Sequence, residues 1–90
     1  EIILDPNQVI RIGERSPYLY VVQGMLLYLS DEYEEISAPT TGGILDGLTS
    51  QSIASFQRFN DLTETGELDK KTWKYLVNQF TLQANREAPI

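Results

Sequence analysis

The chain has 90 residues, of which 41% are hydrophobic and 22% are charged, a composition typical of one globular domain. Seven basic against thirteen acidic residues give a net charge of −6, which argues against nucleic-acid binding, because that affinity comes mostly from neutralising phosphates. The sequence has neither Cys nor His, which excludes zinc sites built from thiolate and imidazole, cysteine nucleophiles and Ser-His-Asp triads.

The most apolar segment of the chain is YLYVVQGMLLYL, residues 18–29. It is shorter than the ~20 residues that a membrane span needs, and it contains a glutamine and a glycine. The sequence therefore predicts a buried helix here and no membrane span.

The first half of the chain predicts an extended arm, a helix and a long loop. Residues 1–12 carry several β-branched side chains and a proline, which favour an extended conformation. Ser16 and Pro17 form a helix start signal, a capping hydroxyl followed by proline at the first helical position. Apolar residues then recur at helical spacing and predict a helix over residues 17–30. Residues 30–43 have no sustained period and end in turn residues, so we expect a loop.

The second half predicts two more helices, over residues 47–60 and from about residue 70 to residue 80. Apolar side chains recur in both at three- and four-residue steps. We therefore expect an all-α fold, a three-helix bundle that forms a single domain over residues 1–90. Its expected parts are a core over residues 11–80, an extended arm over residues 1–10 and a fraying tail over residues 81–90.

The pattern Gly-x-Leu-Asp-x-x-Thr occurs twice, at residues 43–49 and 66–72, each time at the start of a predicted helix. Glycine permits a tight turn, and aspartate is a preferred N-cap that suits the positive end of the helix dipole. Threonine stands at the capping-box position, and leucine can fold back on the first turn as a hydrophobic staple. Trp73 can receive that staple in the second copy, whereas Ser50 cannot in the first. The repeat predicts two helix starts and not a ligand loop or a metal site.

With three helices placed, the order of residues resembles the small trihelical peptidoglycan-binding domain found beside bacterial wall hydrolases. The resemblance covers about residues 11–77 and is carried by three blocks that occur in the family's order. The blocks are Gly13, Ser16, Leu19, Val22, Gln23 and Leu26; then Gly43, Leu45, Asp46, Thr49, Ser52, Ile53, Phe56 and Gln57; then Leu62, Thr65, Gly66, Leu68, Asp69, Thr72, Trp73 and Leu76.

The resemblance implies a non-catalytic module that binds peptidoglycan, through its glycan or its peptide stem, without a cofactor. Such a module holds a fused or associated wall-acting domain at the bacterial wall, in an extracellular or wall-associated location. No general base, nucleophile or metal constellation is visible in the sequence, which also argues against an enzyme. The alternative is a protein–protein interaction or scaffolding domain that kept the fold and lost wall binding.

The chain departs from the family pattern directly before the second helix. The family's Asp-Gly is replaced by Gly42-Gly43, and the Phe-Gly that follows is replaced by Leu45-Asp46. An aromatic ring and a carboxylate are thereby lost from a loop that can serve as a ligand wall. Both functions, wall binding and scaffolding, stay open for this loop.

The first predicted helix carries a second apolar stripe beside its core stripe, formed by Tyr18, Val21, Met25 and Tyr28, with Tyr20 and Leu27 beyond it. A helix that is apolar over more than half of its circumference is covered on two sides or binds something. Either the N-terminal arm or the C-terminal tail covers this stripe, or it docks a neighbouring domain, a glycan or a second copy of the chain in weak self-association. Arg15 is a candidate partner for a carboxylate of a wall peptide.

Two other features are predicted to be structural. Gln23 and Gln57 each lie next to an apolar core position, so we expect them to satisfy backbone groups at helix junctions. The acidic residues of segment 31–35 lack the alternating oxygen ligands and the glycine of a calcium loop, which predicts a solvated loop and no metal.

Overall fold

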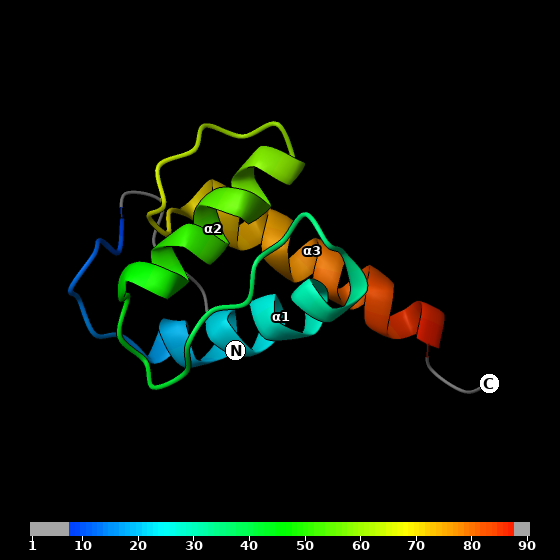
Figure 1. Cartoon of the computed structure of the whole chain (residues 1–90), viewed down its shortest axis with the longest axis horizontal. Coiled ribbons are helices and arrows are strands. Elements are labelled where there is room, and N and C mark those ends of the chain that lie inside the picture. The colour runs from blue at the N-terminus through cyan, green and yellow to red at the C-terminus, as the bar shows by residue number, and fades with distance from the viewer. Residues whose placement is uncertain (1–7, 88–90) are drawn as a thin grey trace.

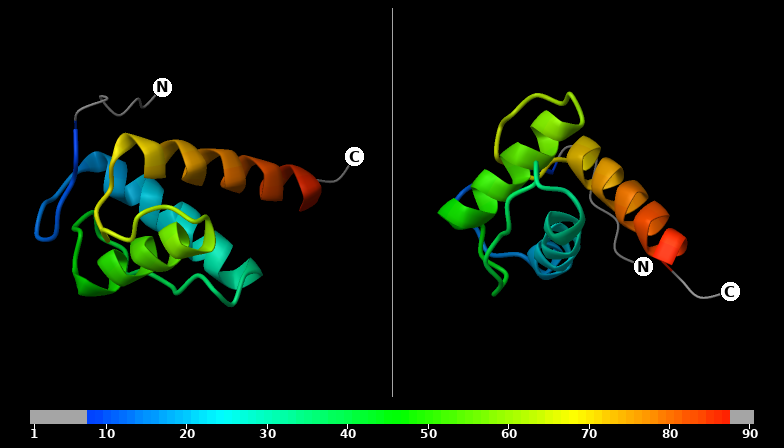
Figure 2. Two further views of the ribbon diagram at one scale, coloured as in Figure 1. Left: turned by 90° about the horizontal axis from the view of Figure 1, so that it is seen from above. Right: turned by 45° about the vertical axis from the view of Figure 1, so that its right-hand side comes forward.

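The computed structural model describes residues 8–87, which form three helices: α1 (Pro17–Glu32), α2 (Gly47–Phe59) and α3 (Lys70–Glu87). Strand pairing in this part of the chain is limited to two isolated antiparallel bridges. The helices run in the same general direction, and each connection returns to the end where the next helix starts (Figure 1, Figure 2). The predicted all-α, three-helix fold is confirmed.

The core lies where the helices meet the returning loops. Its buried apolar residues are Ile10, Leu19, Val22, Met25, Leu26, Leu29, Ile36, Leu45, Ile53, Phe56, Leu68, Trp73 and Leu76. Leu45 and Leu68 are equivalent residues of the two repeated phrases, so each phrase contributes one core side chain directly before its helix. Trp73 is buried, as its helical phase predicted.

Each helix begins at a side chain that caps its first turn. Ser16 Oγ accepts a hydrogen bond from a first-turn backbone N–H of α1 at 3.2 Å. Asp46 accepts one from the Thr49 N–H at 2.9 Å, and Asp69 accepts one from the Thr72 N–H at 2.8 Å. The repeated phrase is a helix start both times, as the sequence predicted, and each cap stabilises the fold by about 1 kcal/mol.

Gln23, on α1, holds the first repeated phrase. Its Oε1 accepts a hydrogen bond from the Gly43 N–H at 2.9 Å. Its Nε2 donates to the Ile44 carbonyl and to Thr49 Oγ1, both at 3.0 Å. One buried amide therefore fixes both the turn glycine and the first turn of α2.

Gln57, on α2, holds the second phrase through the same three positions. Its Oε1 accepts from the Gly66 N–H at 3.0 Å, and its Nε2 donates to the Glu67 carbonyl at 3.2 Å and to Thr72 Oγ1 at 3.0 Å. It also accepts from the Thr65 N–H at 2.9 Å. Both glutamines are only 1% exposed, so these bonds replace water and attach each return loop to the preceding helix. The structural role predicted for the two glutamines is confirmed.

The segment before α1, residues 10–16, ties the two phrases together. Ile10 exchanges two backbone hydrogen bonds with Leu68, of 2.8 and 2.9 Å. The Gly13 N–H donates to the Leu45 carbonyl at 2.8 Å, and the Leu45 N–H donates to the Glu14 carbonyl at 2.9 Å. This segment therefore forms a short backbone bridge between the starts of α2 and α3.

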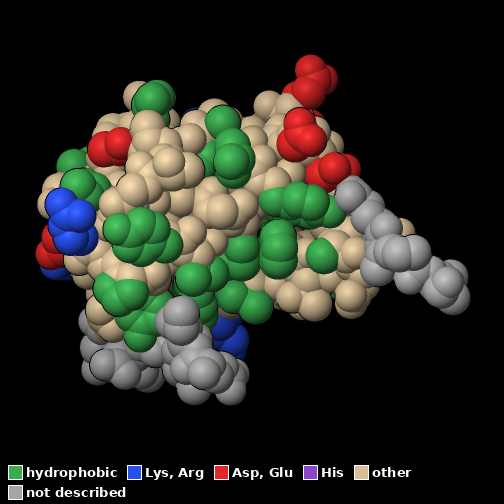
Figure 3. All heavy atoms as spheres, turned by 90° about the horizontal axis from the view of Figure 1, so that it is seen from below, with side chains coloured by type: hydrophobic (Ala, Val, Ile, Leu, Met, Phe, Trp, Pro, Cys, Tyr) green, Lys and Arg blue, Asp and Glu red, His purple; other side chains and the backbone are tan. Residues whose placement is uncertain are grey.

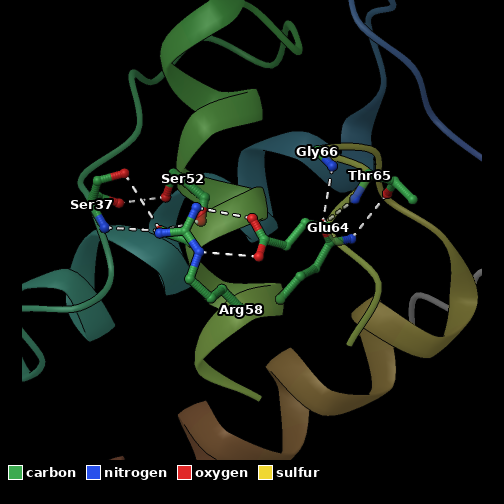
Figure 4. A network of polar contacts seen from close by, with 8 residues as sticks. Ser37, Ser52, Arg58, Glu64, Thr65 and Gly66 are labelled. Atoms are coloured by element: carbon green, nitrogen blue, oxygen red, sulfur yellow. Dashed lines mark hydrogen bonds and ion pairs between the residues drawn. The ribbon is translucent and has the colours of Figure 1, made fainter. Parts of the chain in front are cut away.

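Serines fasten the long loop between α1 and α2. The Ser37 N–H donates to Ser55 Oγ at 3.0 Å, and Ser52 Oγ donates to the Ser37 carbonyl at 2.5 Å. The loop after α2 is held in part by the ion pair between Arg58 and Glu64, at 2.9 Å. Figure 4 shows these contacts on the two sides of α2.

The helix boundaries differ from the predicted ones mainly in α3. This helix continues to Glu87, so residues 81–87 of the predicted tail are helical. The apolar period stops near residue 80, but the residues that follow are mostly good helix formers, and their propensity extends the helix without an apolar stripe. Most of the predicted arm and the end of the tail, residues 1–7 and 88–90, lie outside the described residues.

We expect Gln57→Ala to destabilise the fold by about 2–4 kcal/mol, because it leaves the buried Gly66 N–H without its acceptor and opens a cavity. Urea denaturation monitored by Trp73 fluorescence measures this loss. Gln51→Ala, at an exposed position of the same helix, is the matched control and should change stability by less than about 0.5 kcal/mol. Equal losses in the two variants would contradict the structural role of Gln57.

Candidate ligand-binding surfaces

The second apolar stripe of α1 packs largely against α3. The Tyr18 ring meets the Trp73 ring edge-on with 5.6 Å between centroids, and the Tyr28 ring meets the Phe80 ring edge-on at 5.2 Å. Met25 is buried in the core. Two residues of α3, Trp73 and Phe80, therefore cover part of this face, whereas the cover suggested by the sequence was the arm or the tail.

The five candidate site residues are not brought together. Tyr18, Met25 and Tyr28 take part in internal packing, whereas Val21 is 37% exposed and Arg15 is exposed before α1. A ligand contact of these residues stays a prediction. Among them, Arg15 and Val21 have the access to solvent that such a contact requires.

Tyr20, outside the predicted set, lies on the turn glycine of the first phrase. A Cβ added to Gly43 would stand 2.6 Å from two carbons of the Tyr20 ring, so the ring lies directly against the glycine backbone. Gly43 has φ of 78°, a conformation that favours glycine. Tyr20 is nevertheless 59% exposed, which leaves much of the ring open to solvent. The glycine at position 43 was the sequence signal for a close contact at this turn, but only the fold shows that the side chain in contact is Tyr20.

Arg15 and Ile44 form one of the two antiparallel bridges. The flanking hydrogen bonds run from the Leu45 N–H to the Glu14 carbonyl and from the Ser16 N–H to the Gly43 carbonyl, at 2.9 and 3.1 Å. This is the non-hydrogen-bonded type of pair, in which opposed side chains lie closest.

We call the exposed side chains of Arg15, Tyr20 and Ile44 the loop face. Ile44 follows Gly43, on which the Tyr20 ring lies, and Arg15 is paired with Ile44, so the three residues belong to adjoining backbone positions of one turn. Figure 3 shows hydrophobic side chains spread over the side of the molecule on which α1 lies.

Asp46 fixes the opposite side of the same turn. Thr40 Oγ1 donates to its Oδ2 at 2.5 Å while the Thr49 N–H donates to its Oδ1 at 2.9 Å. These two bonds, that of Thr40 first, lower the pKa of the Asp46 carboxyl below its usual range. The replacement of the family's glycine by Asp46 thus adds a cap and a loop tether at one position.

A hollow of about 160 Å³ lies at the other end of the domain, where α1 and α2 end. Its lining residues are Tyr33, Phe59, Gln79, Leu82, Gln83 and Arg86. The Tyr33 and Phe59 rings pack together with 5.0 Å between centroids and a tilt of 45°. The last turns of α3 form its other wall and extend beyond the two shorter helices (Figure 2).

Polar groups surround the aromatic floor of this hollow. The Tyr33 hydroxyl donates to Gln83 Oε1 at 3.1 Å, and Gln83 Nε2 donates to Glu32 at 3.1 Å. The Gln79 amide is hydrogen-bonded to Asn60. Arg86 makes no ion pair with any residue that the structure describes. Sequence reasoning missed this hollow because its two walls come from segments far apart in the chain.

The acidic residues of segment 31–35 are exposed in the structure, as the sequence predicted. Within residues 8–87, no group of three or more acidic side chains lies close enough to hold a metal ion. No helix in that part of the chain combines the length and the apolar character that crossing a membrane requires.

A family model described as a putative peptidoglycan binding domain matches residues 18–76, which is 59 of the 90 residues. The chain belongs to this family. The resemblance inferred from the three blocks of residues is thereby confirmed, and the chain is a peptidoglycan-binding module. The match includes Tyr20, the first phrase and the second phrase, and it ends before the C-terminal half of α3.

Among solved structures, the chain is similar to one titled "The crystal structure of SleB N-terminal domain". The two share 24% sequence identity and superpose with a TM-score of 0.66, over 82% of this chain and 94% of that one. At this identity the similarity supports the fold alone. A comparison with curated protein sequences finds no significant match.

We expect the stability difference between the native protein and Asp46→Asn to be largest at neutral pH and to vanish in acid. Because the folded-state pKa of Asp46 is lowered, its stabilisation is complete above the unfolded-state pKa of about 3.9 and is lost as the pH falls through the folded-state value. Urea denaturation from pH 7 to pH 2.5 measures this, with the exposed Asp31→Asn as the control for net charge. A difference that stayed constant with pH would show that the carboxylate charge has no role.

Proposed function

We propose that this domain binds the glycan of peptidoglycan through the loop face, with Tyr20 as the stacking platform. The observation that carries this proposal is an aromatic side chain that is 59% exposed yet fixed in place against Gly43. Pyranose rings present apolar C–H faces, which pack on aromatic rings while the sugar hydroxyls stay in water. Tyrosine suits this contact because it has an apolar face and a polar tip.

The loop face is held rigid by contacts beneath it, which favours binding. Gln23 bonds both the Gly43 N–H and the Ile44 carbonyl, and Thr40 tethers the loop to Asp46. A surface that is already ordered loses little conformational entropy when a ligand binds. Leu45, which stands where the family pattern has an aromatic residue, is buried in the core, so the exposed ring at this turn is that of Tyr20.

Arg15 gives this acidic domain a local cation beside the platform. The net charge of −6 disfavours broad attraction to anionic wall polymers, so a wall carboxylate requires a specific partner. Arg15 is paired with Ile44 in the antiparallel bridge and is exposed, so its side chain is available to a carboxylate of the wall. Arg15 thus keeps, within this proposal, the role of a partner for a wall carboxylate.

The domain acts in this proposal as a non-catalytic attachment module. It holds a fused or associated wall-acting domain at the bacterial wall, outside the cell. The loop face is small and shallow, so its own affinity is modest. Attachment works by raising the effective concentration of the partner domain near its substrate.

Tyr20→Ala should reduce retention of the purified domain on insoluble peptidoglycan by about fivefold or more, because the stacking surface is removed. Co-sedimentation across a salt series measures retention, and circular dichroism verifies that the fold is intact. Tyr75→Ala removes another exposed tyrosine, on α3, and should leave retention unchanged.

A pair of glycine variants tests the same platform without deleting its ring. The Cβ added by Gly43→Ala collides with the Tyr20 ring, so the ring must move. Gly42 also has a positive φ, of 119°, but the Cβ added by Gly42→Ala meets no atom within 4 Å. Only Gly43→Ala should lower retention. Unchanged retention in both Tyr20→Ala and Gly43→Ala would overturn the proposed binding site.

We also propose weak self-association through the part of α1 that α3 leaves uncovered. Val21 and Leu27 are 37% and 46% exposed there, and a Cβ at Gly24 would meet nothing within 4 Å, which lets a second chain approach the helix closely. One helix face is small for an interface, so we expect dissociation in the millimolar range, roughly 4 kcal/mol.

Sedimentation equilibrium at high protein concentration tests this association. Leu27→Ser should abolish it, whereas Leu48→Ser, which removes a similarly exposed leucine from α2, should not. A monomer at all concentrations in the native protein would refute the proposal.

A further inference from the structure

The hollow at the ends of α1 and α2 has one wall that the family match does not include. That wall consists of Gln79, Leu82, Gln83 and Arg86, which follow residue 76 at the i, i+3, i+4 and i+7 positions of α3. These four side chains share one face of the helix because of their spacing. The hollow therefore depends on the extension of α3 beyond the matched segment.

The hollow combines two elements of a small recognition site. Tyr33 and Phe59 pack together among its lining residues, and Phe59 is partly exposed. Arg86, also in the lining, is exposed and makes no ion pair among the described residues. The amides of Gln79 and Gln83 are already hydrogen-bonded to Asn60, Tyr33 and Glu32. Together the two rings and Arg86 fit a small apolar group that is followed by a carboxylate.

The size of the hollow limits the ligand. At about 160 Å³ it is smaller than the roughly 300–1,000 Å³ of a typical small-molecule pocket, so it accommodates the end of a chain and not a whole oligosaccharide. The ligand chemistry that fits is a short peptide with a small apolar side chain and a free terminal carboxylate.

We propose that this hollow binds the carboxylate end of the peptide stem of peptidoglycan. The stem is a short peptide with small side chains and a free carboxylate, so it complements the aromatic floor and Arg86. This inference rests on the proposed function, since it takes peptidoglycan as the partner, but it assigns the stem to a site separate from the loop face.

The two sites lie at opposite ends of α1. Tyr20 lies in the first turn of α1, and Tyr33 follows its last residue, so they are thirteen residues or about 20 Å apart along the helix. A stem of four or five residues spans roughly 13–18 Å when extended, which is less than this separation. The glycan contact at the loop face and the stem contact at the hollow are therefore separate contacts.

Nuclear magnetic resonance titration of the ¹⁵N-labelled domain with a synthetic stem peptide tests this site. A peptide with a free carboxylate should shift the backbone signals of Phe59, Gln79 and Arg86. The same peptide amidated at its C-terminus should bind about five- to tenfold more weakly, because it lacks the charge that Arg86 recognises. Arg86→Gln should lose the same factor, whereas Lys74→Gln, which removes a cation elsewhere on α3, should not.

The outcomes separate this inference from the proposed function. No binding of the free-carboxylate peptide, shifts that fall elsewhere, or equal binding by Arg86→Gln would overturn the inference, even if Tyr20→Ala still loses retention on whole peptidoglycan. Stem binding at the hollow together with full retention by Tyr20→Ala would support the inference and overturn the loop face as the glycan site.

Discussion

The structure depends on one interaction that is used twice, a buried glutamine that holds the turn before the next helix. Gln23 and Gln57 each accept from the turn glycine, donate to the following carbonyl and donate to the threonine of the first helical turn. A domain of this size has a modest core, so its return loops need polar anchors that exclude water. The bonds also set the position of each helix start relative to the helix before it.

This arrangement divides the domain into two ends with different properties. The three helix starts, residues 10–16 and the loop face lie at one end, where hydrogen bonds fix the backbone closely (Figure 1). The ends of α1 and α2 and the extended α3 lie at the other, where side chains surround the hollow. The topology therefore places an ordered turn at one end of the helices and a hollow between helix ends at the other.

The stretch before α2 shows how a family member can change a loop and keep the fold. Gly43, a glycine that the family pattern shares, lies under Tyr20 with a positive φ, and the substitution by Asp46 adds an N-cap that Thr40 also binds. Leu45, another substitution, is a buried core residue, and the exposed ring at this turn is that of Tyr20 from α1. The second apolar stripe of α1 is explained in part by contacts with α3. Tyr18 packs on Trp73 and Tyr28 packs on Phe80, which leaves a narrower exposed strip on α1.

The sequence by itself determined the three helices, their capping residues, the structural role of both glutamines and the family, because these follow from local spacing and from side-chain chemistry near the backbone. It did not determine that α3 continues to Glu87, since propensity without an apolar stripe is a weak signal. Only the tertiary structure decided that Tyr20 lies on Gly43, that Arg15 opposes Ile44, and that Tyr33, Phe59 and Arg86 enclose one hollow. The physical reason is that each of these surfaces joins segments distant in the chain, whose approach is set by packing and not by local sequence.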